Sequence, residues 1–185
     1  MKPAPAHILQ LFFRWVRVEI DEEHLPPEPI NPLVSAHWLE GVKISSECGT
    51  LLIDEAHEWG TLFMTSLRVR IENERSGKDP EQNFSPYKVD VEARATIVVI
   101  KGAESLGPVE DIAAVNGTSM VWSAIREQVA AITSRMPAGP LVLPSMTFRD
   151  VAPSVSKSRE ALALTEAAPQ PKERKEARTG RKKSV

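Results

Sequence analysis

Four segments rich in β-branched and aromatic residues follow one another with no helical pattern between them, and this order restricts the fold more than any other feature. The four segments are residues 11–20, 41–46 with a continuation at 50–53, 61–74 and 87–101. Within the third segment Leu67, Val69 and Ile71 alternate with charged side chains, which is the period of a strand with one buried face. Strands joined by loops form antiparallel sheets, because parallel strands need long crossovers that usually contain a helix. We therefore expect a four-stranded antiparallel sheet.

Two irregularities interrupt this pattern. The alternation in residues 11–20 slips near Trp15 and Val16, which predicts either a β-bulge or a strand that is buried on both faces at one end. Residues 25–32 contain four prolines, which lack the N–H group that a sheet ladder requires and which favour an extended backbone. We expect a crossover loop at this place, and not a hairpin turn.

A single long helix is predicted after the sheet. It begins at about Thr118 or Ser119, either of which can cap free backbone amides, and it ends before Pro137. Its apolar residues recur in steps of three and four and form one stripe: Trp122, Ile125, Val129, Ile132 and Met136. An extended arm at 141–148 and a short helix at 158–167 follow, so the expected fold class is α+β.

The charge of the chain is unevenly distributed. The chain has 185 residues, of which 42% are hydrophobic, enough for one globular domain with a core. Its net charge of −2 combines −7 over residues 1–150 with +5 over residues 151–185, where nine Lys and Arg face four Glu. We expect one domain at 1–167 and a disordered basic tail at 168–185. An acidic body of this kind is not expected to bind nucleic acid, because phosphate binding needs clustered cations on the folded part.

No segment has the composition of a membrane anchor or a secretion signal. The apolar runs are far shorter than the roughly 20 residues that span a bilayer, and charged residues interrupt the first strand where a signal peptide would be continuously apolar. With a single cysteine, Cys48, the chain has no internal disulfide. These features indicate a cytoplasmic protein with no membrane insertion.

Candidate catalytic and metal-binding motifs are incomplete. Residues 54–57 read Asp-Glu-Ala-His, the box of a helicase ATPase, but no Gly-x-x-x-x-Gly-Lys-Ser/Thr phosphate loop precedes them. His37, Cys48 and His57 lack the paired short spacing of a zinc site. We expect no enzyme activity, no cofactor and no metal.

The four tryptophans allow two interpretations. Trp15, Trp38, Trp59 and Trp122 can belong to the core, or some can line an apolar groove that binds other chains. Composition does not separate these alternatives.

The order of elements and several local sequences resemble the SecB family of protein-export chaperones. Residues 116–127 read Asn-Gly-Thr-Ser-Met-Val-Trp-Ser-Ala-Ile-Arg-Glu, which is similar to the start of the family's long helix, with an aromatic followed by Arg-Glu. Residues 141–151 read Leu-Val-Leu-Pro-Ser-Met-Thr-Phe-Arg-Asp-Val and resemble the family's arm. Trp38 followed by Val42-Lys43-Ile44 resembles the start of its second strand. The resemblance extends over residues 7–165.

The resemblance implies an ATP-independent holdase that binds unfolded precursor polypeptides, assembles as a homotetramer (a dimer of dimers) and passes clients to the SecA translocation motor in protein export. It places a client-binding groove between the crossover loop and the helix: Leu25, Ile30, Leu33, Trp38, Val121, Trp122 and Ile125. For docking of the motor, the nearest acidic residues are Glu19, Asp90 and Glu92.

Two features depart from the family's pattern. The helix has Ser123-Ala124 where Pro-Tyr is common, and the chain ends in a basic tail. Two alternatives therefore stay open: a SecB-like chaperone dedicated to one client, such as the antitoxin of a toxin–antitoxin pair, and a non-chaperone oligomeric module.

Overall fold

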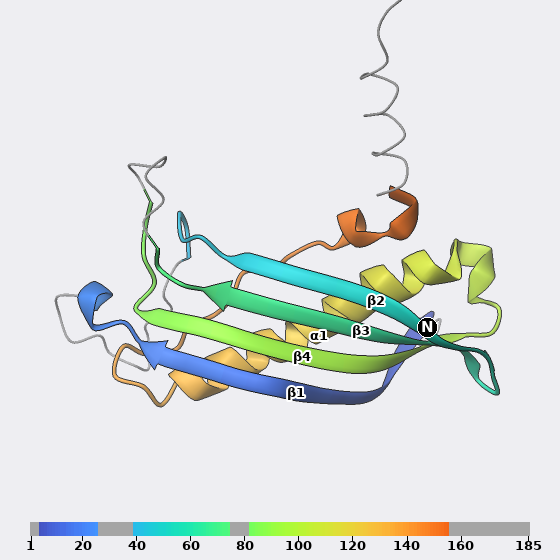
Figure 1. Cartoon of the computed structure of the whole chain (residues 1–185), viewed down its shortest axis with the longest axis horizontal. Helices are drawn as coiled ribbons and strands as arrows, with labels where there is room; N and C mark the ends of the chain where they lie inside the picture. The colour runs from blue at the N-terminus through green and yellow to red at the C-terminus, as the bar shows by residue number, and fades with distance from the viewer. Residues whose placement is uncertain (1–3, 26–38, 75–81, 156–185) are drawn as a thin grey trace, which may run out of the picture.

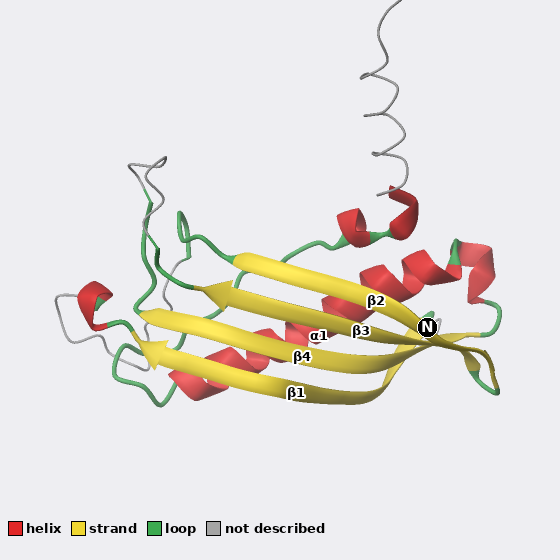
Figure 2. Ribbon diagram, in the orientation of Figure 1, coloured by secondary structure: helices red, strands yellow, loops and turns green. Residues whose placement is uncertain are grey.

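The structure, a computed structural model, describes residues 4–25, 39–74 and 82–155. Four strands form one antiparallel sheet in the order β1-β4-β3-β2, with bounds Ala6–Ile20 for β1, Ser45–His57 for β2, Gly60–Ile71 for β3 and Tyr87–Ile100 for β4. Helix α1 (Val109–Thr133) crosses one face of the sheet diagonally (Figures 1 and 2). The predicted α+β fold with a four-stranded antiparallel sheet is confirmed.

Three short 3-10 helices, η1 (Glu22–His24), η2 (Ala103–Leu106) and η3 (Arg149–Val151), and a helical turn at 153–155 complete the described elements. The predicted bulge is confirmed by a shift in the β1–β4 register between Phe13 and Trp15. The predicted helix at 158–167, the tail at 168–185 and most of the crossover loop lie outside the described residues. None of the helices in the described ranges is long and apolar enough to cross a membrane.

Helix α1 begins earlier than the sequence pattern predicts. It starts at Val109, directly after Pro108, and not at Thr118 or Ser119. Thr118 is buried, and the Ser119 hydroxyl donates to the carbonyl of Val115 inside the helix. The start has a recognisable signal, because a proline at the beginning of a helix and acidic residues in its first turn (Glu110 and Asp111) both favour helix initiation.

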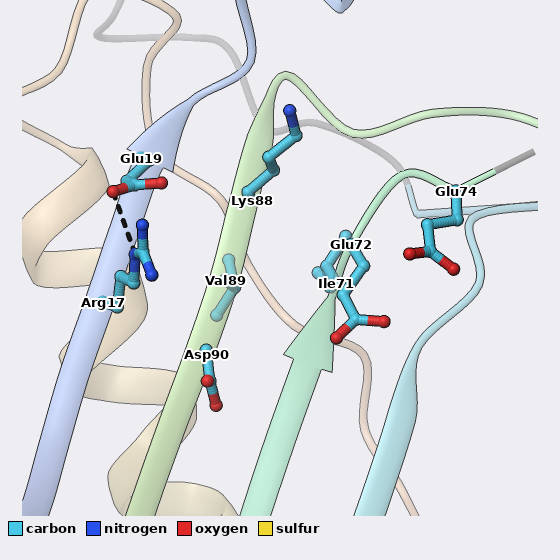
Figure 3. A pocket seen from close by; sticks show the side chains of 8 residues that line it. All are labelled: Arg17, Glu19, Ile71, Glu72, Glu74, Lys88, Val89 and Asp90. Atoms are coloured by element: carbon cyan, nitrogen blue, oxygen red, sulfur yellow. Dashed lines mark hydrogen bonds and ion pairs between the residues drawn. The ribbon is translucent and has the colours of Figure 1, made fainter.

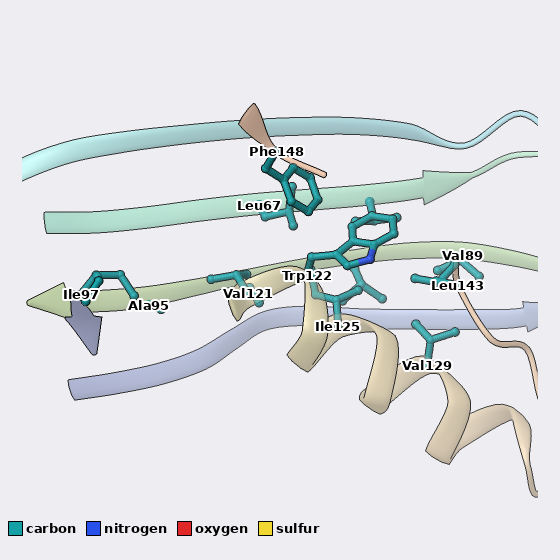
Figure 4. Packing of buried hydrophobic residues seen from close by; sticks show 14 of the residues in the cluster. Leu67, Val89, Ala95, Ile97, Val121, Trp122, Ile125, Val129, Leu143 and Phe148 are labelled. Carbon is teal, nitrogen blue, oxygen red and sulfur yellow. The ribbon is translucent and has the colours of Figure 1, made fainter. Parts of the chain in front are cut away.

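The core lies between α1 and the inner face of the sheet, by which we mean the face that α1 covers. On β4 the inner residues are apolar along the whole strand, with Ala93 and Ala95 at its centre. From α1, Val121, Ile125 and Val129 project into this layer and are fully buried (Figure 4). The predicted apolar stripe of the helix is thus its core-facing side, with its C-terminal residues Ile132 and Met136 partly buried.

Gly117 allows α1 to approach the sheet closely. A Cβ atom at this position would lie 2.5 Å from the Thr65 hydroxyl oxygen and 3.2 Å from the Ile97 side chain. Both neighbours belong to the inner face of the sheet, on β3 and β4. Glycine therefore serves here as a spacer between helix and sheet, and its conformational freedom is not required.

The chain after α1 folds back over the core. Thr133 begins this return, since its hydroxyl oxygen accepts from the backbone N–H of Leu141 at 2.8 Å. The buried Tyr87 hydroxyl donates to the carbonyl of Gly139 at 2.6 Å. The arm at 141–148 then buries Leu141, Leu143 and Phe148.

We predict that Gly117→Ala destabilises the protein. In an ordinary helix this change adds roughly 1 kcal/mol of stability, whereas forcing a methyl group into a packed core costs about 1–3 kcal/mol. Because the contact with Thr65 is so short, we expect a net loss of about 1–2 kcal/mol in the free energy of unfolding, measured by urea denaturation.

Ser123→Ala, on the exposed side of the same helix, is the matched control and should change stability by no more than a few tenths of a kcal/mol. Adding Thr65→Ala to Gly117→Ala should restore part of the loss. A single Gly117→Ala variant more stable than the natural chain would contradict the close packing described above.

Candidate functional site

The edge strand β2 carries a continuous row of exposed apolar residues. Leu51, Leu52 and Ile53 are 70%, 39% and 48% exposed, and we call them the β2 apolar strip. Among the described strands β2 pairs with β3 alone, so its outer edge presents backbone groups that no described strand pairs, beside these side chains. Contiguous exposed apolar residues on an open strand edge are typical of a surface that binds another polypeptide segment.

The register of β2 with β3 distributes the strip over both faces of the sheet. Leu52 lies opposite the buried Phe63 and therefore on the inner face, while Leu51 lies opposite Met64 on the outer face. The register shifts between Leu52 and Asp54, which leaves Ile53 as the extra residue. An extended apolar segment paired with β2 could therefore contact leucine on either side.

A cleft opens on the inner face beside the strip. It has a volume of about 230 Å³ and is lined by Thr50, Leu52, Phe63, Glu110 and Pro153. These residues come from β2, β3, the first turn of α1 and the chain that follows the arm. The cleft combines an apolar floor with a carboxylate from α1.

The predicted helix contribution to an exposed groove is wrong. Val121 and Ile125 have no exposed surface, and Trp122 is 4% exposed. The physical reason is the arm: Trp122 donates its indole N–H to the carbonyl of Pro144 at 3.0 Å, and its ring lies 5.7 Å from that of Phe148 (Figure 4). In the described part of the chain these three residues belong to the core.

The crossover residues are placed only in part. Leu25 is 42% exposed and follows η1, whereas Ile30, Leu33 and Trp38 lie outside the described residues. Of the other tryptophans, Trp59 is 55% exposed at the β2–β3 turn and Trp15 is partly buried on the outer face. The two interpretations of the tryptophans thus apply to different residues, with Trp122 in the core and Trp59 on the surface.

Both described ends of the crossover loop are fixed to the chain just before β4. At one end the His24 ring lies 4.3 Å from the Phe84 ring. At the other, the Asn83 side-chain amide donates to the carbonyl of Glu40 at 2.8 Å, and its backbone N–H donates to the carbonyl of Gly41 at 3.1 Å. The positions where the loop leaves and rejoins the domain are therefore defined by neighbouring residues.

A buried carboxylate that the sequence analysis missed holds the end of β1. Asp21 is 2% exposed and accepts from Asn73 Nδ2 at 2.7 Å, with His24 Nδ1 at 3.0 Å and Lys88 Nζ at 3.5 Å. Burial raises the pKa of this carboxyl, but the hydrogen bonds from Asn73 and His24 and the charge of Lys88 more than offset it, so the pKa of Asp21 is below its ordinary value. No spacing rule could have found this cluster, because Asn73 and Lys88 come from segments distant from Asp21 in the sequence.

With Glu23, Asp21 and His24 also form a possible cation-binding group among the described residues. The donors of Asn73 and Lys88 already occupy the Asp21 carboxylate, so this group is explained as a structural anchor. Of the candidate ligands from the sequence analysis, Cys48 is exposed on β2, and His57 is the last residue of that strand. His37 lies outside the described residues.

The acidic residues predicted to dock a motor lie on the outer face, and each has an arginine partner. Asp90 accepts from Arg68 Nε at 2.8 Å and from Arg68 Nη2 at 2.7 Å. The Glu92 carboxylate lies 3.1 Å from both Arg14 and Arg94. Glu19 accepts from Arg17 at 2.9 Å, at the margin of a cleft of about 290 Å³ that is lined by residues of both charges (Figure 3).

Trp15 stabilises this charged network. Its indole N–H donates to Asp90 at 3.2 Å, and the guanidinium groups of Arg14 and Arg68 each lie 5.1 Å from its ring centre. The Arg68 hydrogen bonds, more than the additional bond from Trp15, lower the pKa of Asp90 despite partial burial. The outer face is therefore an organised surface of paired charges and not an open acidic patch.

Comparison with known proteins finds a likeness among solved structures and none among family models or curated proteins. No family model matches the chain, and no curated protein matches it. Among solved structures, the chain is similar to the Rv1957 SecB-like chaperone of Mycobacterium tuberculosis, solved in complex with a ChAD peptide from the Rv1956 HigA1 antitoxin, with 18% identity and a TM-score of 0.43. The match covers 78% of this chain and 92% of the other.

We predict that Asp21→Asn destabilises the protein in a pH-dependent way. At neutral pH the neutral amide loses the charge-assisted bonds from Asn73, His24 and Lys88, which should cost about 2 kcal/mol in the free energy of unfolding. Because the folded pKa is below the unfolded value of roughly 3.9, the contribution of Asp21 is fully present above about pH 4 and is lost as the pH falls through the lowered pKa.

The difference between Asp21→Asn and the natural chain should therefore narrow on acidification, as measured by urea unfolding between neutral pH and about pH 3. Asp54→Asn, at an exposed aspartate, is the control and should change stability little. A gap between the natural chain and Asp21→Asn that stays constant over this range would show that the ionised carboxylate does not stabilise the folded state.

Proposed function

We propose that this protein is an ATP-independent holdase chaperone that binds apolar segments of unfolded polypeptides. The observation that carries the proposal is the β2 apolar strip, whose leucines and isoleucine are exposed along an unpaired strand edge. The resemblance of residues 116–151 to the SecB family supports the same function. A holdase needs accessible apolar surface and no catalytic group.

The strip can hold a client by simple means. Burying apolar surface contributes about 25 cal/mol per Å² removed from water, and backbone pairing along an open edge does not depend on the client's sequence. Binding of this kind tolerates many sequences and needs no nucleotide.

The proposed client surface differs from the one that the sequence predicts. It keeps Leu25, which is exposed, and the crossover residues Ile30, Leu33 and Trp38 remain proposed contributors. The helix residues are replaced by Leu51, Leu52 and Ile53 of β2. A client is thus proposed to contact the sheet edge, and not the buried stripe of α1.

The export role would require a further contact, because Glu19, Asp90 and Glu92 would have to bind the SecA motor. Each of these carboxylates already pairs with arginine on the outer face, so a basic partner would have to compete with Arg17, Arg68 or Arg94. This observation favours the second candidate function, a chaperone dedicated to one polypeptide such as an antitoxin, which needs no motor. Binding of purified SecA to the outer face would distinguish the export role from the dedicated one.

The proposed assembly is a homotetramer, as the resemblance implies. The other edge strand, β1, exposes Ile8, Leu9 and Phe12 to 37%, 41% and 39%. Apolar residues on this edge are a suitable contact for a second copy of the chain. The proposal thus assigns the β1 edge to assembly and leaves the β2 edge for clients.

We predict that Leu51→Ser combined with Ile53→Ser weakens client holding. Loss of two exposed apolar contacts of about 1–2 kcal/mol each corresponds to at least tenfold weaker binding. The measurement is suppression of light scattering by a reduced, denatured model protein, with the chaperone present at increasing ratio. Folding stability should change little, because both side chains are exposed.

Leu106→Ser is the matched control, since Leu106 is 71% exposed in η2, away from β2. It should suppress aggregation as well as the natural chain does. Native mass spectrometry should give four chains of 20.4 kDa for all three proteins, and a single-chain mass would contradict the proposed assembly. If the natural chain does not suppress aggregation at stoichiometric ratio, the holdase proposal is wrong.

A further inference from the structure

The described chain ends directly beside the β2 apolar strip. Pro153 lines the same cleft as Thr50 and Leu52. Ser154 is held one residue later, because both its backbone N–H and its hydroxyl donate to the Asp111 carboxylate in the first turn of α1. The point from which the remaining residues continue is therefore fixed next to exposed leucine.

The sequence that continues from this point suits the strip. Residues 156–167 read Ser-Lys-Ser-Arg-Glu-Ala-Leu-Ala-Leu-Thr-Glu-Ala, and the following 168–185 contain no leucine, isoleucine, phenylalanine or tryptophan. Leu162 and Leu164 are thus the leucines of the C-terminal segment. The docked segment is taken as extended, in contrast to the helix that the sequence pattern predicts, because only then do Leu162 and Leu164 share one face. An extended chain spans up to about 3.3 Å per residue, so the seven or more residues after Val155 can bring either leucine back along β2.

Charge also favours this placement. Lys157 and Arg159 are the first charged residues after Ser154. Glu110 and Asp111, on the first turn of α1, lie at the cleft and at the anchor of Ser154. Cations that follow the anchor within a few residues are complementary to these two carboxylates.

We propose that residues 156–167 of the same chain occupy the β2 apolar strip at Leu52 when no partner polypeptide is bound. In this state Leu162 and Leu164 lie against Leu52. Lys157 and Arg159 face Glu110 and Asp111. This segment then acts as an internal competitor for client binding, a role that rests on the proposed holdase function. A tethered segment acts at an effective concentration on the order of millimolar, so two leucines can cover Leu52, on the inner face of the strip, although their intrinsic affinity is low. A client with a longer apolar segment displaces them.

The proposal can be tested by the reactivity of one thiol in the full-length chain. Thr50→Cys, made together with Cys48→Ser so that it supplies the single thiol, places a reporter in the cleft lined by Leu52 and Pro153. Its rate of reaction with an aromatic disulfide reagent is compared with the rate in the same chain that also carries Leu162→Ser and Leu164→Ser. We expect the leucine variant to react at least about threefold faster, because an occluded thiol reacts only when the segment leaves.

Ala161→Ser with Ala163→Ser is the matched control, since it adds the same hydroxyl groups at interleaved positions of the segment, and it should keep the slow rate. Equal rates in all three proteins would overturn the docking. Protection that increases with protein concentration would also overturn it, because the occupant would then be the tail of another copy.

The same proteins separate this inference from the proposed function. If both are correct, the leucine variant suppresses aggregation at a lower chaperone ratio than the natural chain. If leucine-dependent protection of the thiol is found without any suppression of aggregation, the docking stands and the holdase function fails. If the natural chain and the leucine variant suppress aggregation equally and their thiols react at equal rates, the holdase function stands and the docking fails.

Discussion

The close packing of α1 on the sheet is the interaction on which the rest of the structure depends. Gly117 on the helix meets Thr65 and Ile97, and small residues at the centre of β4, Ala93 and Ala95, leave room for the helix above them. At this short separation the side chains of α1 fill the inner face of β3 and β4, together with part of β1. The arm then closes the remaining space with Leu141, Leu143 and Phe148, and Trp122 is sealed beneath it.

This packing also determines which apolar residues stay exposed. One helix lies diagonally across the four-stranded sheet (Figure 1) and packs on β4, β3 and β1 much more than on the edge strand β2. Strand β2 contributes few inner contacts to α1, so its leucines remain open although they are as apolar as those of the core. The proposed binding surface thus lies on the strand that the single helix leaves largely uncovered. The charged outer face is different, because its carboxylates already pair with arginines and its ion pairs are supported by Trp15.

Sequence patterns predicted the parts of this structure that depend on local periodicity. The four strands, the bulge near Trp15 and the existence of an apolar stripe on α1 followed from alternation and spacing. The start of α1 was missed because Thr118 is also a good cap residue, although Pro108 carried the true signal. The placement of Trp122 could not be derived, since a stripe of apolar residues has the same spacing whether an arm covers it or a client does. Likewise, the Asp21 cluster depends on contacts between residues 52 positions apart, which no local pattern contains.

Hydrogen exchange of the protein with and without a bound unfolded polypeptide tests the central claim most directly. The account predicts that client binding slows exchange in β2 around Leu51–Ile53, where edge amides have no partner within the sheet. It predicts no new protection on the outer face around Arg68 and Asp90, whose charges are already paired. Protection confined to the outer face, with β2 exchanging as fast as in the free protein, would contradict the assignment of the β2 edge as the client-binding surface.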